Sequence, residues 1–336
     1  MALELSNIIF TNQDDIVPLF GVEQIVVNTG IANTLAGNDT ITGSGSRVDY
    51  YSSPYGISNS GTFNTGEGDD VITGTAIMSG FINSGTFNTG EGDDIVIADG
   101  QYGGRALENS GTFNTGEGDD VITANTKVGI GFENTDTFDT GEGDDVITAK
   151  SGAGLGFRNT DTFNTGKGND IITVDGQFTG GLENTGTFNT GEGDDVITAK
   201  TSAPGVGFKN TGTFNTGEGD DAITGEGFFK GILTNSGSIF DTGDGNDKIR
   251  GDSKNGSSLP NSGGIFNYSS TFNTGDGNDT IEGIGRYGIY NATVIETGNG
   301  KDIITANSVA TKGSNETGGI YNLGTINTGN NAIRFT

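Results

Sequence analysis

Apolar residues recur along this chain in a fixed order and not at helical spacing. The segment 62–73 reads TFNTGEGDDVIT, and in it Phe63 and Ile72 stand on either side of a Gly-rich acidic turn. The segments that carry such apolar residues are short, rich in Thr, Val, Ile and Phe, and bounded by Gly, as is typical of strands. None shows the i, i+3, i+4, i+7 spacing of a helix. The pattern predicts short β-strands whose side chains alternate between a core and the solvent.

The same segment returns with a period of about 25 residues along most of the chain. We call the second acid of each copy a marker aspartate. The marker aspartates are Asp39, Asp70, Asp94, Asp120, Asp145, Asp170, Asp195, Asp221, Asp247, Asp279 and Asp302. Insertions lie around residues 47–57 and 251–268, and degenerate copies occur at Asp15 and Asn331. About twelve units then cover residues 1–336 as one domain, with degenerate coils over 1–38, regular repeats over 39–305 and a degenerate coil over 306–336.

Further rows of like residues accompany the marker. A Phe precedes it by seven positions, at Phe63, Phe87, Phe113, Phe138, Phe163, Phe188, Phe214, Phe240 and Phe272. A second apolar row lies six positions before this Phe, or seven for the last member, at Ile57, Phe81, Leu107, Phe132, Phe157, Leu182, Phe208 and Leu233. An Ile follows most markers by two positions, at Ile72, Ile122, Ile147, Ile172, Ile197, Ile223, Ile249 and Ile281. An Asn row occupies Asn59, Asn83, Asn109, Asn134, Asn159, Asn184, Asn210 and Asn235.

These rows indicate a stack of coils. Equivalent residues of stacked coils lie about 4.8 Å apart. The Phe and Ile rows are then expected to fill a core, and the Asn row is expected to pass amide hydrogen bonds from coil to coil. The sequence therefore predicts an all-β fold, a single parallel β-solenoid of β-helix or β-roll type with about twelve coils.

Composition supports a repeat stack and limits its partners. The chain has 62 Gly, only 4 Pro and 31% apolar residues, too few for a large globular core. Its net charge of −28 would repel a phosphate backbone, which excludes nucleic acid and leaves cations as partners. Disordered acidic tails do not repeat Phe in register. The N-terminus lacks the features of a signal peptide, and no run approaches the ~20 apolar residues of a membrane span.

The sequence gives little support to catalysis. His and Cys are absent, so zinc and haem ligation, thiol nucleophiles and imidazole bases are excluded. Paired carboxylates can hydrolyse glycosides, but every acid pair here is a copy of its neighbours. We therefore expect a protein that is not an enzyme.

The acidic turn carries the candidate chemistry. Residues 65–73 read T-G-E-G-D-D-V-I-T, which resembles the nonapeptide G-G-x-G-x-D-x-U-x of hemolysin-type, or RTX, calcium-binding repeats. Thr replaces the first Gly of that motif, and only one nonapeptide occurs in each repeat. The resemblance implies calcium between stacked turns, along one corner of the solenoid. The implied ligands are the marker aspartates with the turn glycines Gly66, Gly68, Gly90, Gly92, Gly116, Gly118, Gly141, Gly143, Gly166, Gly168, Gly191, Gly193, Gly217, Gly219, Gly243, Gly245, Gly275 and Gly277.

Electrostatics favours calcium independently of this resemblance. Carboxylates about 5 Å apart repel by roughly 3 kcal/mol per pair at an effective dielectric of 20. A divalent cation between turns reverses this, and oxygen ligands suit Ca²⁺. Ten stacked motifs leave about nine gaps, so we expect about nine calcium ions. The alternative is that Gly and Asp merely form turns.

Outward rows suggest what such a stack contacts. Thr62, Thr86 and Thr112 should share an exposed face with Asn64 and Asn88, an array that resembles ice-binding solenoid surfaces or simply suits an exposed strand. A Val/Ile stripe includes Val71, Ile95, Val121, Val146, Ile171 and Val196, and is either an association surface or ordinary β-propensity.

The two ends of a solenoid expose strand edges, and apolar end coils could pair head to tail into a filament. The residues expected to pair are Ile8, Ile9, Phe10, Val17 and Phe20 at one end and Ile320, Leu323, Ile326, Ile333 and Phe335 at the other. Polar cover from Asn12, Gln13, Asn330 and Asn331 is the alternative. Because extracellular fluid supplies millimolar calcium, we expect a calcium-binding extracellular or cell-surface structural or adhesive protein that self-associates. Ice or glycan binding is the alternative function.

Overall fold

The computed structural model describes residues 2–17, 26–45, 55–254, 262–308 and 318–329. The chain divides into two compact units, Met1–Lys167 and Gly168–Thr336, here the first and second units. Both units are parallel β-solenoids with almost no helix, and the described residues make about 11 turns, close to the predicted twelve. The predicted all-β solenoid is confirmed, whereas the prediction of a single domain stays a prediction.

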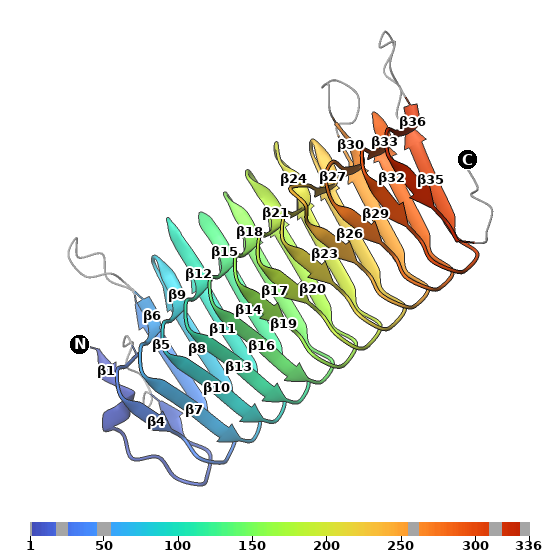
Figure 1. Ribbon diagram of the computed structural model, residues 1–336. Helices are drawn as coiled ribbons and strands as arrows, with labels where there is room; N and C mark the ends of the chain where they lie inside the picture. The colour runs from blue at the N-terminus through green and yellow to red at the C-terminus, as the bar shows by residue number, and fades with distance from the viewer. Residues whose placement is uncertain (1, 18–25, 46–54, 255–261, 309–317, 330–336) are drawn as a thin grey trace. The chain divides into compact units, whose positions relative to one another are not determined.

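Each unit contains three parallel sheets, which we call A, B and C (Figure 1). In the first unit, sheet A consists of β1 (Leu3–Glu4), β3 (Val26–Asn28), β6 (Tyr55–Asn59), β9 (Ser79–Asn83), β12 (Gly104–Asn109), β15 (Gly129–Asn134) and β18 (Leu155–Asn159). Its sheet B consists of β2 (Ile16–Val17), β5 (Thr40–Gly45), β8 (Val71–Ala76), β11 (Ile95–Gly100), β14 (Val121–Thr126) and β17 (Val146–Ser151). Its sheet C consists of β4 (Ile31–Asn33), β7 (Thr62–Glu67), β10 (Thr86–Glu91), β13 (Thr112–Glu117), β16 (Thr137–Glu142) and β19 (Thr162–Asn164).

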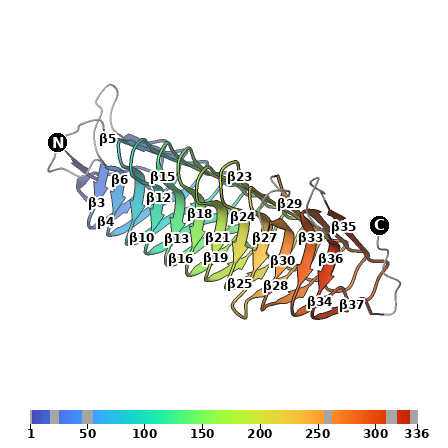
Figure 2. The ribbon, with the colours of Figure 1, turned by 90° about the horizontal axis from the view of Figure 1, so that it is seen from above.

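The second unit repeats this arrangement (Figure 2). Its sheet A consists of β21 (Gly180–Asn184), β24 (Val206–Asn210), β27 (Lys230–Thr234), β30 (Gly263–Asn267), β33 (Tyr287–Asn291) and β36 (Gly318–Asn322). Its sheet B consists of β20 (Ile171–Gly176), β23 (Val196–Thr201), β26 (Ala222–Gly227), β29 (Lys248–Ser253), β32 (Thr280–Gly285) and β35 (Ile303–Ser308). Its sheet C consists of β22 (Thr187–Asn189), β25 (Thr213–Asn215), β28 (Ile239–Asp241), β31 (Thr271–Asn273), β34 (Val294–Glu296) and β37 (Thr325–Asn327).

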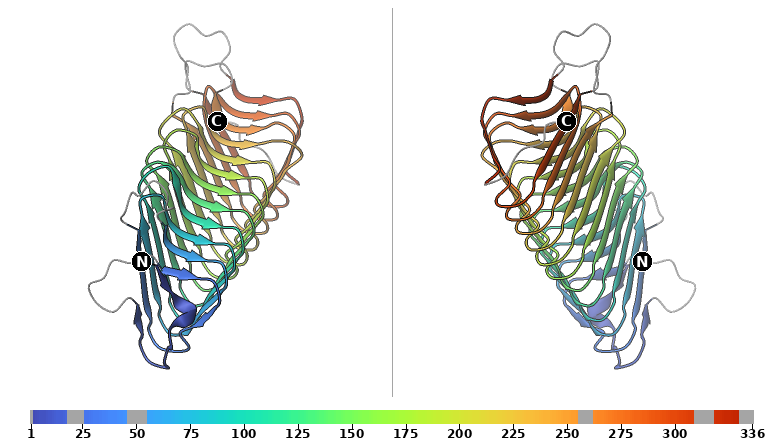
Figure 3. Two further views of the ribbon diagram at one scale, coloured as in Figure 1. Left: turned by 90° about the vertical axis from the view of Figure 1, so that its left-hand side faces the viewer. Right: turned by 90° about the vertical axis from the view of Figure 1, so that its right-hand side faces the viewer.

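A coil passes through sheet A, then sheet C, then sheet B, and the acidic turn joins C to B. The three strands of a coil lie on different sides of its interior (Figure 3). Equivalent residues pair across coils, as Phe87 does with both Phe63 and Phe113. The in-register stacking that the repeat predicts is therefore present within each unit.

The core consists of the predicted apolar rows. Phe63, Phe87 and Phe113 have no exposed surface, and neither does Ile72 on sheet B. Within the first unit, the Phe132 and Phe157 rings stack with centroids 4.4 Å apart and planes 7° from parallel. The faces of these two rings thus cover each other, whereas the Phe63 and Phe87 rings meet edge to face with planes 70° apart.

Two members of the predicted rows are wrong, because the turn between β27 and β28 has four residues (235–238), whereas the turn between β24 and β25 has two (211–212). Ile232, and not Leu233, pairs with Phe208 and lies in the core. Thr234, and not Asn235, pairs with Asn210. A side-chain period of two turns a one-residue error into the opposite face of the sheet.

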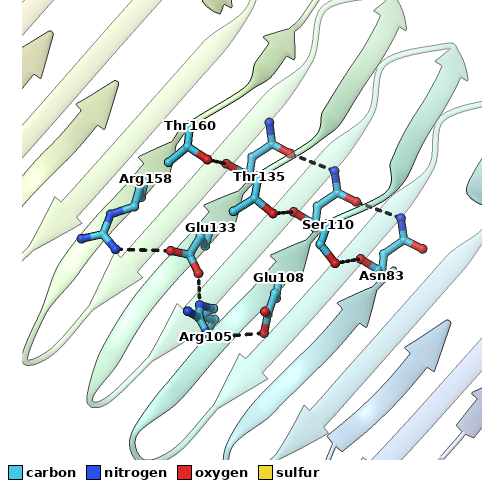
Figure 4. A network of polar contacts seen from close by, with 10 residues as sticks. Asn83, Arg105, Glu108, Ser110, Glu133, Thr135, Arg158 and Thr160 are labelled. Carbon is cyan, nitrogen blue, oxygen red and sulfur yellow. Dashed lines mark hydrogen bonds and ion pairs between the residues drawn. The ribbon is translucent and has the colours of Figure 1, made fainter. Parts of the chain in front are cut away.

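The Asn row forms the expected ladder at the end of most sheet A strands (Figure 4). Asn83 Nδ2 donates to Asn109 Oδ1 at 2.8 Å and to the Thr112 carbonyl at 2.8 Å. These amides are fully buried, so each bond satisfies a group that water cannot reach. The ladder therefore links consecutive coils through the interior.

A charged row lies on the outer side of sheet A in the first unit (Figure 4). The Glu133 side chain, which is 6% exposed, accepts from Arg158 Nη1 at 3.3 Å and contacts Arg105 Nε. Arg105 also lies 3.6 Å from Glu108. Most acids of this face are thus neutralised locally, unlike those of the acidic turns.

The first coil has a cover that the repeat does not predict. A turn of 3-10 helix, η1 (Leu5–Asn7), contacts β3 and β4, and Leu5 is fully buried. Glu4 Oε1 accepts the Thr29 N–H at 2.8 Å. Of the residues expected at the two ends, Phe20, Asn330, Asn331, Ile333 and Phe335 lie outside the described residues, so the head-to-tail contact stays a prediction. In the part of the chain that the structure describes, no helix has the length and apolar character needed to cross a membrane.

Candidate functional site

Glycine makes the acidic turn possible. Gly66 and Gly68 have φ of 116° and 125°, a region that residues with a Cβ rarely adopt. A Cβ placed on Gly90 would lie 1.8 Å from the Gly66 carbonyl oxygen of the preceding coil. All predicted turn glycines except Gly277 have such a positive φ. The stacked turns therefore pack backbone against backbone, and no larger residue fits.

Backbone hydrogen bonds join consecutive turns. The Gly68 N–H donates to the Glu91 carbonyl at 2.7 Å, and the Gly92 N–H donates to the Glu117 carbonyl at 2.8 Å. The second unit repeats this contact, for example from the Gly193 N–H to the Glu218 carbonyl at 2.8 Å. The turns are thus held at strand spacing along their length.

The marker aspartates form one buried column in each unit. Their exposure is between 0% and 4%. Oδ1 of most markers accepts the backbone N–H of the marker one coil earlier, as Asp94 Oδ1 does from Asp70 at 2.8 Å. The same bond joins Asp120 to Asp94 in the first unit and Asp221 to Asp195 in the second. The predicted alignment of the markers is therefore present, and one oxygen of each carboxylate is already used to hold the preceding coil.

The acid before the marker has a second structural role, which the repeat does not predict. Asp69 Oδ1 accepts the N–H of Asp93 at 3.1 Å, and Asp93 Oδ1 accepts the N–H of Asp119 at 2.9 Å. These bonds run toward the next coil, whereas those of the marker run toward the previous one. The Asp-Asp pair therefore binds the turns on both sides. Such contacts need a short side chain, because its carboxylate must reach a backbone N–H of the neighbouring turn.

A Thr row also enters the site, at the first position of each turn. Thr65 Oγ1 donates to the Thr89 carbonyl at 3.0 Å, and Thr115 Oγ1 donates to the Thr140 carbonyl at 3.0 Å. These hydroxyls are buried. They occupy the position at which the RTX nonapeptide that this turn resembles has its first Gly, which was the only sequence signal for them.

The second oxygen of many markers has no donor. Among the described residues, Oδ2 is buried without a hydrogen-bond partner in Asp39, Asp70, Asp94, Asp120, Asp195 and Asp221. The Thr115 hydroxyl lies near Asp120, but it directs its proton to a carbonyl of the next coil. A buried carboxylate oxygen without a partner is costly, and it points to a proton or a cation that completes the site.

Burial also changes the acidity of the column. It raises the pKa of Asp94, Asp120 and Asp195 to about 7, although the backbone N–H of the preceding marker, which donates to Oδ1, opposes the change. The pKa of Asp70 rises to about 6 for the same reason. Neighbouring carboxylates raise these pKa values further, because like charges disfavour ionisation.

The ligand atoms of the turns are of the type that a hard cation prefers, but the acids are not clustered around one point. Every available ligand is oxygen, and an unpartnered carboxylate oxygen recurs in successive turns. Among the described residues, however, no three acidic side chains gather at one point. A cation between two turns would therefore draw on at most two markers, with backbone carbonyls completing the six to eight oxygens that Ca²⁺ takes. The number and identity of its ligands stay a prediction.

The remaining acids of the turn face the solvent. Glu67, Glu91, Glu117 and Glu142 are exposed, as are Asp69 and its equivalents. Glu142 pairs with Lys167 at 3.7 Å within the first unit. The Glu row thus supplies negative charge at the corner but no buried ligand. Comparison with protein-family models, with curated proteins and with solved structures gave no match to this chain, so the resemblance to RTX repeats rests on the turn residues.

Proposed function

We propose that this chain is a calcium-binding structural or adhesive repeat protein that works outside the cell. One observation carries the proposal, namely the column of buried marker carboxylates whose Oδ2 atoms have no hydrogen-bond partner. Asp70, Asp94 and Asp120 stand in consecutive coils, so their unmet oxygens also follow one another. Calcium would supply those oxygens with a partner and cancel their mutual repulsion.

The charge of the chain supports a divalent cation. The net charge is −28, and within the first unit each turn from Glu67 to Asp144 carries three acids. A self-repelling row of this kind destabilises a compact state unless counterions bind. Extracellular fluid supplies calcium at a concentration that weak sites of this type require. The stiff coil-to-coil packing suits a spacer or an adhesive element, and self-association or a surface glycan would be its partner.

Thermal unfolding of the full chain tests the proposal. We expect the melting temperature to rise when CaCl₂ replaces chelator, because a ligand that binds only the native state adds its binding free energy to stability. MgCl₂ is the matched control, since Mg²⁺ sheds water reluctantly and needs near-octahedral geometry. Identical melting curves in chelator and in millimolar calcium would contradict calcium binding.

Ice binding is a second candidate function, favoured by the outer face of sheet C. Thr62, Thr86 and Thr112 pair in register across β7, β10 and β13, with the inward Phe row between them and the Asn row. Asn114 Nδ2 donates to Asn88 Oδ1 at 2.9 Å, which orders the second row. Regularly spaced hydroxyls and amides can order water. Thermal hysteresis in calcium, lost in Thr112→Tyr, is expected if this face binds ice.

A further inference from the structure

The acidic turns belong to two classes, which differ in how marker Oδ2 is satisfied. In the first class, Oδ2 lacks a partner and the Thr hydroxyl donates to the next coil, as at Asp120 and Thr115. In the second class, the Thr hydroxyl donates to Oδ2 of its own turn. This bond measures 2.5 Å from Thr242 to Asp247 and 2.6 Å from Thr274 to Asp279. The turn of Thr297 and Asp302 has the same bond at 2.6 Å.

The backbone separates the same two classes. The first residue of the turn has φ between 97° and 116° at Gly66, Gly90, Gly116, Gly191 and Gly217, and of 84° at Leu35 in the turn of Asp39. In the second class φ falls to 78°, 71° and 60° at Gly243, Gly275 and Gly298. A different rotation of the first turn residue accompanies the redirected Thr hydroxyl, so the change is one of turn conformation and not of a single side chain.

The charge of most turns also differs between the classes, although the first-class turn of Asp39 carries one acid. A first-class turn such as that of Glu117, Asp119 and Asp120 carries three acids. The turns of Asp247 and Asp279 carry two acids each, because Asn246 and Asn278 replace the first acid of the pair. The Asn246 side chain also donates to Asp220 Oδ1 at 2.9 Å. Both the unmet oxygen and part of the charge that a cation would offset are therefore missing from the second class.

We infer that calcium binds only along the first-class turns, and that the hydroxyls of Thr242, Thr274 and Thr297 take its place in the turns of Asp247, Asp279 and Asp302. This inference rests on the proposed function and reduces the expected number of ions below nine. It also divides the second unit into turns that depend on calcium and turns that are complete without it.

Hydrogen exchange of the full chain, followed by mass spectrometry in CaCl₂ and in chelator, tests the inference. We expect calcium to slow exchange by about tenfold or more in peptides that cover residues 66–70, 90–94 and 116–120. Peptides that cover residues 243–247 and 275–279 should change by less than about twofold. If all turns respond alike, the inference is wrong and calcium binding stands. If no turn responds, the proposed function itself fails.

Two matched substitutions sharpen the test. Asp120→Asn keeps the Oδ1 acceptor for the Asp94 N–H but removes the charge, and it should lower the amount of calcium bound at saturation. Asp279→Asn makes the same change in a second-class turn and should leave bound calcium unchanged. An equal loss in the two variants would overturn the division into classes.

Thr274→Val should make a second-class turn sensitive to calcium. It removes the hydroxyl that donates to Asp279 Oδ2, so this turn acquires the unmet oxygen of the first class. Exchange in residues 275–279 should then become sensitive to calcium, whereas Thr115→Val should leave residues 116–120 as responsive as before. A Thr274→Val turn that stays insensitive to calcium would show that the hydroxyl does not stand in for the cation.

Discussion

The backbone N–H of Asp94 donates a hydrogen bond of 2.8 Å to Oδ1 of Asp120, one coil further along the chain. The marker carboxylate is thus a structural group in its own right, whether or not a cation also binds it. Its Oδ1 holds the preceding coil, and its Oδ2 is left for a proton, a hydroxyl or a metal ion. A column of acids can be buried because Oδ1 accepts a backbone N–H and Oδ2 is free to take one of these other partners.

The marker and the Glu of one turn should differ sharply in importance. Asp145→Ala removes the acceptor for the Asp120 N–H, which lies 2.9 Å from Asp145 Oδ1, and should cost about 1–3 kcal/mol in the free energy of unfolding. Glu142→Ala removes an exposed side chain and should cost less than about 0.5 kcal/mol. Urea titration of both variants in calcium, with bound calcium measured in parallel, checks this. Equal losses would mean that the wrong acid has been assigned.

Stability in chelator should fall as the pH rises. Burial raises the pKa of Asp94 and Asp120 to about 7, well above that of an unfolded Asp near 4, so the native state binds more protons between these values. The stability that these two groups contribute is therefore fully present below about pH 4, and it is lost as the pH rises through about 7. Melting temperatures measured in chelator at pH 5 and pH 8 should show the decrease.

Calcium should remove most of this pH dependence, because a bound cation replaces the proton on the carboxylate. The matched control is Asp120→Asn, whose amide does not titrate and which should show a smaller decrease in chelator. A melting temperature that is constant from pH 5 to pH 8 without calcium would contradict the assignment of a protonated column.

The Val/Ile stripe on sheet B should promote lateral association. Val121 and Val146 are half-buried and alternate with fully buried Ile122 and Ile147, which confirms the predicted outward orientation. Val196 is 40% exposed. Replacing Val121, Val146 and Val196 by Thr keeps β-propensity and removes apolar surface, so association measured by sedimentation should weaken. Unchanged sedimentation would leave β-propensity as the reason for this row.

The cover of the first coil should limit end-to-end contact. Glu4 accepts the Thr29 N–H at 2.8 Å and the Ser6 hydroxyl at 2.9 Å, and these bonds hold η1 over the edge of the sheets. Glu4→Ala should expose that edge and increase light scattering at high protein concentration. Glu91→Ala, an exposed acid of a middle turn, is the control. Equal scattering in both variants would show that η1 does not block the edge.

The repeat alone determined the fold and most of its core. Fully stacked coils place like residues in rows, so the spacing of Phe63, Phe87 and Phe113 was enough to predict parallel strands, a solenoid and the inward side of each strand. The predicted register was wrong only at Leu233 and Asn235. A shift of one residue there moves a side chain to the other face of the sheet, and no neighbouring repeat shows this shift. The short cover at Leu5 was also missed, because three residues carry no periodic signal.

The chemistry of the turn depended on the tertiary structure. The sequence aligned the acids, but it did not show that Asp69 and Asp70 bind coils on opposite sides, since both are simply Asp in the repeat. Nor did it show that the Thr hydroxyl donates away from Asp120 and toward Asp279. That choice depends on a glycine φ that differs by tens of degrees between turns, and on which acceptor the next coil brings within reach. Hydrogen-bond direction is a property of stacked coils, whereas the repeat describes a single coil.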